Sequence, residues 1–589
     1  MILFYKKNCK NVRIIFTQII LLLQIKYRIS LQMRLIHFHF NIYSYFCRQK
    51  GYEIIMKKRN KIISIAILAA ILAQTAGCSG NGSGDVGSSD SSLEKGEVSY
   101  PIQTDQKLTY WVTLPSALTT VVSNFGETEF AKEYSKRTGI EVEYSHPAQG
   151  QEANNLSLLI ASDDLPDIIE TDWLSRNPAE SIQLNTITEL NSLIDDYSPN
   201  LKKFLADNPD INRAVKTDSN QYYVYPFVRG DGSSESLTNT SGFMIRQDWL
   251  DKLGVERPET IAEWENVLTL FKDKMGATEP LTVVAYELSF IAGAFGAPNG
   301  FYVDNGKVKY GPMESNFKTF LETAARWYKN GLLDKNFAVL DEKQKQSNFL
   351  SGKTGIVFGS GGSGIGVYVA GLHENNPSSN VTAIRYPVEN KGDIPKFTNE
   401  TTLYTTAGSA AISGKSKNKE LAARFLDYSY SEDGYMLNNF GIEGVSYEMK
   451  DGYPTYTDNI FNNPSGLSIA QAMHKYIRAC NVGPFVQDKR YIEQYYRLDQ
   501  QREALDVWGV SDTDKYCLPQ VTLTKEESSE YTKIMGDLDV YKDETMLKFI
   551  VGNKSIEEFD SYVEEIKRLK IDRAIEIQQA AYDRFIQRK

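Results

Sequence analysis

The amino-acid sequence predicts a mixed α/β protein with two large lobes and a helix-rich C-terminal third. Between residues 107 and 170, strand-like and helix-like segments alternate, which favours a parallel sheet with helices packed against it. Residues 78–589 exceed the length of one ordinary domain, which favours two lobes. From residue 489 onwards, long stretches have helical periodicity.

The first lobe is predicted from five consecutive segments. Residues 107–112 (KLTYWV) alternate in polarity, as a half-buried strand does. A helix is expected over 127–138, because Gly139 follows it as a C-terminal cap. The other three segments are a strand at 140–144, a helix at 154–162 and a short buried strand at 165–170.

Further along the chain, the same reasoning predicts more strands, a hairpin and many helices. The Pro258–Thr260 segment is an internal helix cap within the helix-rich stretch 249–274. Asp304–Lys307 (DNGK) is typical of a hairpin turn. The other expected elements are a strand at 242–246, a helix at 317–328, a turn and strand at 349–358, a glycine-rich loop at 359–366, and helices within 417–441, 489–507, 525–549 and 555–588.

Met56–Cys78 reads MKKRNKIISIAILAAILAQTAGC and has the order of a secretory signal. A basic start precedes an apolar run at 62–73, which is shorter than the roughly 20 residues that a membrane-spanning helix needs. The Thr75–Cys78 ending resembles the lipobox of bacterial lipoproteins, although Gln74 or Thr75 stands where leucine is usual. This resemblance implies cleavage before Cys78 and lipidation of its sulfur. A buried helix, the alternative, does not explain the ordered arrangement.

The segments on either side of this signal are not expected to belong to the folded body. Residues 1–55 hold one acidic residue, Glu53, and no periodicity, so we interpret them as an over-extended start ahead of a true start at Met56. An extra membrane segment at 14–25 is the alternative, but glutamines interrupt this short run. Residues 78–106 are rich in Gly, Ser and Asp and are expected to be a flexible tether.

The charge and the cysteine content of the chain exclude some classes of function and of fold. The chain carries 75 Asp and Glu against 65 Lys and Arg, and residues 1–77 are basic, so the remainder is strongly acidic. Such a surface repels nucleic acid, which is therefore not an expected partner. Beyond Cys78, only Cys480 and Cys517 remain. One disulfide is compatible with a secreted chain, but a fold built on disulfides is not.

Short sequences in a fixed order carry a family resemblance. They are LPDII (165–169), DWLDKLG (248–254), PET (258–260), EW (263–264), WYKNGL (327–332), FLSGKTG (349–355), the stretch 417–441, NNFGIEG (438–444), 535–549 and 571–582. Through them, the chain resembles the extracellular solute-binding proteins of ABC importers, of the carbohydrate type related to maltose-binding protein. Within that group, it is most similar to the long lipoproteins of Gram-positive bacteria.

The resemblance implies a type II, periplasmic-binding-protein-like fold, in which two lobes close around an oligosaccharide in a cleft. Lobe 1 is expected to comprise 107–225 with about 407–470, and lobe 2 to comprise 226–406 with about 471–589. Crossings are expected near Tyr225–Gly242 and Tyr386–Thr406. The resemblance further implies a monomer, lipid-anchored on the extracellular face of the cell membrane, that delivers its ligand to an ABC permease.

No cofactor or metal is expected. Some relatives carry a calcium loop, but Phe271–Pro280 lacks the alternating oxygen ligands that such a loop needs. Gly359–Gly364 has dinucleotide-fingerprint spacing without an evident acidic partner, so a flexible loop at the cleft edge is favoured. Gly352–Thr354 lacks the first P-loop glycine, which is Ser347 here. The three histidines beyond the signal are dispersed and do not have metal-ligand spacing.

Two alternatives to a binding protein stay open, namely a surface glycoside-active enzyme and a surface lipoprotein without a ligand. Paired carboxylates such as Asp163–Asp164 and Asp195–Asp196 are common in an acidic protein and do not by themselves indicate hydrolysis. The order of family segments favours a protein that is not an enzyme.

Candidate ligand contacts are aromatic and polar residues just past predicted strand ends or beside family segments. Aromatic faces suit the C–H groups of sugar rings, while Arg and Glu orient hydroxyls or carboxylates. For each aromatic residue, ordinary core packing is the alternative. The candidates are Trp111, Trp173, Tyr225, Phe227, Arg229, Tyr404 and Glu443, whereas Trp249, Trp264 and Trp327 are expected to be structural.

Overall fold

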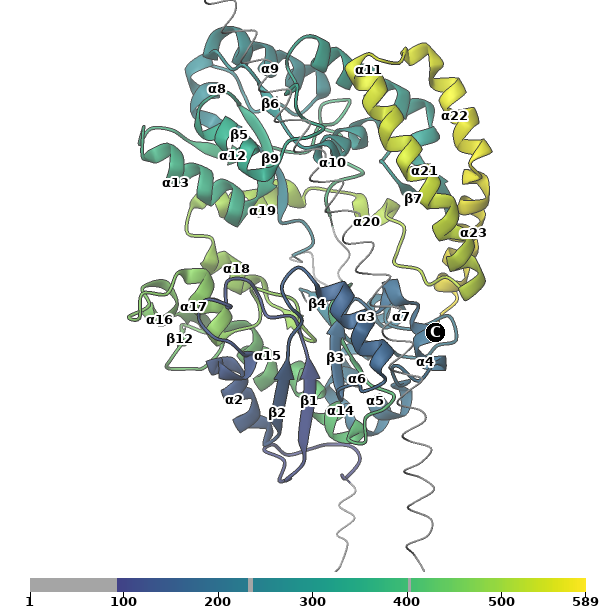
Figure 1. Cartoon of the computed structure of the whole chain (residues 1–589). Coiled ribbons are helices and arrows are strands. Elements are labelled where there is room, and N and C mark those ends of the chain that lie inside the picture. The colour runs from purple at the N-terminus through teal and green to yellow at the C-terminus, as the bar shows by residue number, and fades with distance from the viewer. Residues whose placement is uncertain (1–92, 231–236, 401–403, 589) are drawn as a thin grey trace, which may run out of the picture. The chain divides into compact units, whose positions relative to one another are not determined.

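The computed structural model describes residues 93–230, 237–400 and 404–588 (Figure 1). The predicted signal, Cys78 and the first part of the predicted tether lie outside these ranges. In the part of the chain that is described, no helix has the length and apolar character needed to cross a membrane. The folded body begins before the expected tether end at residue 106, because Arg424 Nη1 donates a hydrogen bond to the Gly96 carbonyl (2.6 Å).

The first lobe is built on a six-stranded sheet with the order β14-β4-β11-β3-β1-β2. β1 pairs in parallel with both β2 and β3, as the predicted alternation requires. β11 runs antiparallel to β3 and β4, and β14 pairs in parallel with β4. The strands are β1 (Lys107–Trp111), β2 (Glu141–Ser145), β3 (Ile168–Thr171), β4 (Tyr225–Arg229), β11 (Tyr404–Ile412) and β14 (Val486–Gln487).

Local signals in the sequence fix the helices of this lobe. The Thr128 hydroxyl accepts a hydrogen bond from Ala131 N–H (3.0 Å) at the start of α2, and Gly139 ends that helix at φ 74°. The helical segments are η1 (Phe125–Glu127), α2 (Glu129–Thr138), α3 (Glu152–Ser162), η2 (Leu174–Arg176), α4 (Pro178–Gln183), α5 (Asn191–Tyr197), α6 (Pro199–Asp207), α7 (Pro209–Ala214), α14 (Lys419–Asp427), η6 (Tyr428–Tyr430), α15 (Glu432–Phe440), α16 (Asp458–Phe461), α17 (Ile469–Tyr476) and α18 (Lys489–Tyr495). A hairpin, β12 (Tyr447–Lys450) and β13 (Tyr453–Tyr456), follows α15.

The second lobe has a four-stranded sheet with the order β10-β5-β9-β6. Its strands are β5 (Ser241–Arg246), β6 (Leu281–Thr282), β9 (Ile356–Ser360) and β10 (Val381–Ala383), with a separate hairpin of β7 (Phe301–Asp304) and β8 (Lys307–Tyr310) at the predicted turn. The predicted cap is present, because Thr260 and Glu263 form a capping box at the start of α9.

Helices cover this second sheet and make up most of the C-terminal third. They are α8 (Gln247–Leu253), α9 (Ile261–Met275), α10 (Ala285–Leu288), η3 (Ser289–Phe295), η4 (Gly311–Met313), α11 (Ser315–Lys329), α12 (Glu342–Leu350), η5 (Gly361–Gly366), α13 (Val367–His373), α19 (Asp499–Gly509), α20 (Thr513–Tyr516), α21 (Lys525–Val551), η7 (Ile556–Glu558), α22 (Phe559–Arg568) and α23 (Ile571–Ile586). α21 lies against α11 and α23, which places the C-terminal helices on the second lobe's core (Figure 1).

The lobe division differs from the expected one near residue 471. Arg478 pairs with Glu170 of β3, and β14 joins the first sheet, so residues 471–488 stay with lobe 1. The chain returns to lobe 2 with α19, where Trp508 Nε1 donates to the Phe243 carbonyl (3.1 Å). The chain thus crosses between the lobes three times, as the expected division implies, but the third crossing lies shortly before α19 rather than near residue 471, and no change of periodicity marks it.

The glycine-rich segment after β9 is a helical turn and not the flexible cleft-edge loop that we expected. Gly361–Gly366 forms η5 and leads directly into α13. A Cβ atom at Gly361 would lie 2.6 Å from the Tyr496 ring, so close packing requires glycine there.

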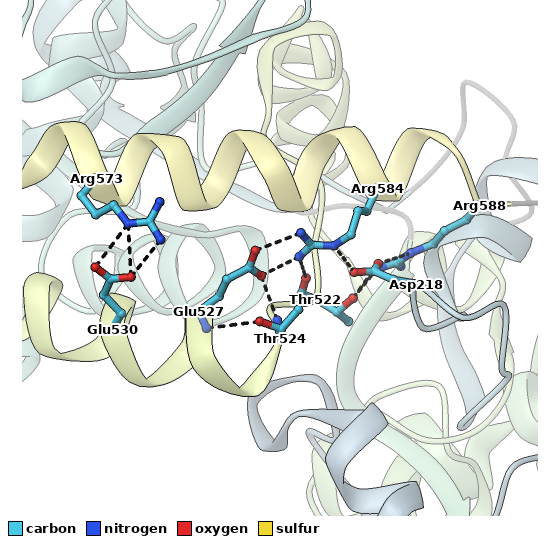
Figure 2. A network of polar contacts seen from close by, with 8 residues as sticks. All are labelled: Asp218, Thr522, Thr524, Glu527, Glu530, Arg573, Arg584 and Arg588. Atoms are coloured by element: carbon cyan, nitrogen blue, oxygen red, sulfur yellow. Dashed lines mark hydrogen bonds and ion pairs between the residues drawn. The ribbon is translucent and has the colours of Figure 1, made fainter.

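A network of charged residues joins the C-terminus to the first lobe, and we call it the C-terminal clasp (Figure 2). Asp218, between α7 and β4, accepts hydrogen bonds from Arg584 Nε (2.6 Å) and Arg588 Nε (2.9 Å). The same carboxylate accepts from the Thr522 hydroxyl (2.9 Å), while Arg584 also pairs with Glu527 (2.6 Å). Because all of these partners belong to the C-terminal helical segment, one aspartate ties that segment to lobe 1.

We predict that Asp218→Asn lowers the free energy of unfolding by about 2–3 kcal/mol at neutral pH. The Arg588 side chain is only 1% exposed and would keep a charge without a carboxylate partner. Burial acts to raise the pKa of Asp218, but hydrogen bonds from Arg584 and Arg588 lower it below its ordinary value. A carboxyl group whose pKa is lower in the folded state than in the unfolded state stabilises the folded protein at pH values above the unfolded-state pKa. This contribution is lost as the pH falls through the folded-state pKa.

Denaturant unfolding of both proteins at several pH values checks this prediction. The difference between wild type and variant should shrink as pH falls below the ordinary aspartate range. The matched control is Asp210→Asn, which removes a 90%-exposed carboxylate paired with Arg213 and should change stability by less than about 1 kcal/mol. Equal effects of the two substitutions would contradict a stabilising clasp.

Candidate functional site

A pocket of about 630 Å³ opens where the carboxyl ends of β1, β2 and β3 meet. Residues from 111–116, 149–156 and 170–176 line it, and these segments lie at or just after the ends of the three strands. Gly408 of β11, Asn481 and Val482 complete the lining. Ligands of open α/β sheets bind at this edge, and pockets for small ligands have volumes of about 300–1,000 Å³.

Part of the pocket lining is apolar. Trp111, the last residue of β1, lines it together with Leu114, Leu156 and Val482. Trp111 is 6% exposed, so the lobe buries most of this residue, although it lines the pocket. An indole face in a pocket with polar neighbours is suited to stack on the C–H face of a sugar ring.

A buried ion pair forms the floor. Glu170 of β3 accepts a hydrogen bond from Arg478 Nη2 (2.8 Å) and another from the Tyr110 hydroxyl (2.7 Å). The Arg478 guanidinium also lies 5.0 Å from the centre of the Phe125 ring. Burial raises the pKa of Glu170, and the neighbouring Arg478 opposes that effect. The pair therefore presents little net charge to the pocket, while it fixes the 478–483 loop to the sheet.

Two glycines allow that loop to lie close against β11. Gly408 has φ 76°, and a Cβ atom there would lie 2.4 Å from Val482 Cγ2. A Cβ atom at Gly483 would lie 2.4 Å from Arg478 Nη2. Any larger residue would therefore displace the loop or the guanidinium, so these glycines bring Asn481 and Val482 to the pocket.

Polar residues surround the rest of the pocket. Asp172 Oδ1 accepts hydrogen bonds from Leu174 N–H (3.1 Å) and Ser175 N–H (3.3 Å). Glu152 Oε1 accepts from Gly150 N–H (2.8 Å). Backbone donors thus orient both carboxylates, and the second oxygen of each can accept a hydrogen bond from a ligand. Arg176 supplies a donor from the same loop as Asp172.

The described residues show neither a metal-binding cluster nor an activated thiol. Within them, no group of three or more His, Cys, Asp or Glu side chains could hold a metal ion. Cys480 and Cys517 are both free, so they do not form the disulfide that the sequence would allow. Burial raises the pKa of the Cys480 thiol to about 12, which makes it a poor nucleophile.

Of the ligand contacts predicted from the sequence, the structure brings only Trp111 to this pocket. Four aromatic candidates lie in the hydrophobic cores, and core packing is the alternative that we considered for each of them. Trp173 is 1% exposed and donates its indole N–H to the Ile169 carbonyl (3.0 Å). Tyr225 bonds through its hydroxyl to Ser198, Tyr404 to Tyr223, and Phe227 packs against Phe485. None of these four side chains lines the pocket, and their assignment as ligand contacts stays a prediction.

The two charged candidates stay untested predictions outside this pocket. Arg229 ends β4 with its guanidinium 5.4 Å from the centre of the Phe227 ring, and burial lowers its pKa. Its Nε is buried without a hydrogen-bond partner among the described residues. Glu443 is exposed in the turn after α15. Cys78 lies outside the described residues.

Several lining residues were missed from the sequence. Asp172, Ser175 and Arg176 directly follow the predicted strand at 165–170, so their position past a strand end was an available signal. Glu152 follows the second strand in the same way. Asn481 had no such signal, because it lies in a part of the chain that is far from the three parallel strands in the sequence.

The chain is similar to several characterised binding proteins. The fructooligosaccharide ABC transporter substrate-binding protein FusA of Streptococcus pneumoniae serotype 4 is 26% identical over 568 residues, covering 90% of this chain and 99% of FusA. The polygalacturonan/rhamnogalacturonan-binding protein YtcQ of Bacillus subtilis is 24% identical over 454 residues, covering 74% and 84% of the two chains. The solved structure of the alginate-binding protein AlgQ2 without calcium ion has a TM-score of 0.64 at 25% identity, covering 82% of this chain and 100% of AlgQ2.

These similarities confirm both the two-lobed type II fold and the family predicted from the ordered sequence segments. The family model described as bacterial extracellular solute-binding protein matches residues 126–436, more than half of the chain. That range includes α2, four of the six strands of the first sheet (β2, β3, β4 and β11), all of the second sheet and the start of α15. The chain therefore belongs to the bacterial extracellular solute-binding protein family.

Proposed function

We propose that this protein captures an oligosaccharide in the pocket at the ends of β1, β2 and β3 and delivers it to an ABC importer. The observation that carries the proposal is the pocket itself, which Trp111 lines together with two oriented carboxylates and the amides of Gln149 and Asn481. This combination suits sugar rings, which have apolar C–H faces and hydroxyl edges. The carbohydrate ligands of FusA and YtcQ support the same assignment.

Capture requires the second lobe as well. Every residue of the pocket lining belongs to lobe 1, so capture by closure would need further ligand contacts from lobe 2. A ligand shifts an open–closed equilibrium only if it binds one state better than the other. We therefore assign to lobe 2 the contacts that favour closure, with the three crossings acting as hinges.

The remaining parts of the proposal concern location and partners. A signal from Met56, lipidation at Cys78 and a Gly/Ser-rich tether would hold the protein on the extracellular face of the cell membrane, beside the permease. Two acyl chains on Cys78 would suffice for stable attachment. We propose a monomer that binds no nucleic acid and has no catalytic activity.

Replacement of Trp111 tests the ligand site. We predict that a bound oligosaccharide at about 100 times its dissociation constant stabilises the wild-type domain by roughly 2.7 kcal/mol. Trp111→Leu should remove most of this stabilisation, because the flat aromatic face is lost while much of the apolar packing stays. Thermal unfolding over a panel of oligosaccharides, with and without the substitution, is the measurement.

Trp173→Leu is the matched control, since Trp173 is a core residue of the same lobe. It should lower the melting temperature of the ligand-free protein but leave the ligand-induced shift in place. Loss of the shift in the Trp173 variant alone would place the sugar elsewhere. If no saccharide stabilises the wild type, the carbohydrate assignment fails, and cleavage products in the same mixtures would instead indicate a glycoside-active enzyme.

The anchor has its own test. A thioether requires the cysteine sulfur, so Cys78→Ser should release the protein from membranes into the medium. Fractionation of cells that express each form measures this distribution. Retention of the variant on membranes would contradict lipidation at Cys78, and detection of peptides from residues 1–55 would contradict the start at Met56.

A further inference from the structure

We infer that the pocket selects an uncharged, hydroxyl-rich oligosaccharide over a chain of uronic acids. This inference rests on the proposed function, since it assigns the charge class of the ligand at that same site. It follows from the ionisable side chains that line the pocket. These are the carboxylates of Glu152, Glu170 and Asp172 and the guanidinium of Arg176.

The balance of these charges is negative. Glu170 is already paired with Arg478, whose Nη2 lies 2.8 Å from Glu170 Oε1, so the two together contribute little net charge. Among the other ionisable side chains of the lining, the two negative charges of Glu152 and Asp172 face the single positive charge of Arg176. Arg229, the other guanidinium considered as a ligand contact, does not line this pocket.

A uronic acid chain carries a carboxylate on every ring, and this pocket cannot neutralise it. If Arg176 paired with one uronate, Glu152 and Asp172 would both be left without a cation in the lining. Like charges about 4 Å apart repel by roughly 4 kcal/mol at the effective dielectric constant of a protein surface. Such juxtaposition is a common means by which binding sites reject the wrong partner.

The same carboxylates favour hydroxyl groups. Backbone N–H groups of Gly150, Leu174 and Ser175 fix one oxygen of Glu152 or Asp172, so these acceptors need little reorganisation on binding. Hydroxyl donors to an ionised carboxylate form hydrogen bonds about twice as strong as neutral ones. Trp111 then provides a face for an uncharged ring.

Calorimetric titration with matched ligands tests the inference. Oligogalacturonides and galactose oligomers of the same linkage differ only at C6, which is a carboxylate in one and a hydroxymethyl group in the other. Fructose- and glucose-based oligosaccharides extend the uncharged set. We expect the best uncharged ligand to bind at least about tenfold more tightly than any uronate, a difference of about 1.4 kcal/mol. Added salt should strengthen uronate binding and leave uncharged ligands little changed.

The double variant Glu152→Gln, Asp172→Asn tests whether these two carboxylates cause the preference for uncharged ligands. It should weaken binding of the uncharged ligand and narrow the preference over uronates, while Glu322→Gln, an exposed site on α11, should change neither. Tighter binding of a uronate to the wild type, or an unchanged preference in the double variant, would overturn this inference and leave saccharide capture intact. Absence of binding by every saccharide would instead overturn the proposed function, and this inference with it.

Discussion

The ion pair between Glu170 and Arg478 is the contact on which the proposed ligand site depends. It lies beneath the pocket and joins β3 to a loop from more than 300 positions later in the sequence, with Tyr110 as a third partner. Removal of either charged group would leave the other buried without an oppositely charged partner, at a cost of about 3–5 kcal/mol. The pair also brings Asn481 and Val482 over the sheet, which only the glycines at 408 and 483 permit.

The surrounding fold can be understood from this constraint. Three parallel strands direct their following loops to one edge, which provides most of the lining, and the Arg478 loop closes the remaining side. An unpaired Glu170 in the floor would repel a negatively charged ligand or attract a positively charged one, but its ion pair with Arg478 largely cancels this charge. The pocket's electrostatic character is therefore set by Glu152, Asp172 and Arg176 at its rim. In the proposed function, the second lobe would complete the site through movement about the crossings. The Asp218 clasp gives the two lobes a further contact outside those crossings.

Local signals in the sequence predicted most of the architecture. The five alternating segments of the first lobe, the Thr260 cap and the Asp304–Lys307 turn each depend on neighbouring residues, and all are present. Long-range features were not accessible in this way. The 478–483 loop carries no periodicity of its own, so Asn481 was not placed at the pocket, and the third crossing was expected too early in the chain. Trp173 and Tyr225 follow the same strand-end rule as Trp111, but the direction of a side chain at a strand end depends on twist and on neighbouring helices.

Hydrogen–deuterium exchange of the processed protein, with and without a stabilising oligosaccharide, tests the central claim most directly. If the sugar is held at the ends of the three parallel strands, backbone amides in 111–116, 149–156 and 170–176 should exchange more slowly in its presence. Segments of lobe 2 that close over the ligand should show a weaker effect. Protection confined to other segments, with these three unchanged in a complex that calorimetry shows to be saturated, would contradict the account.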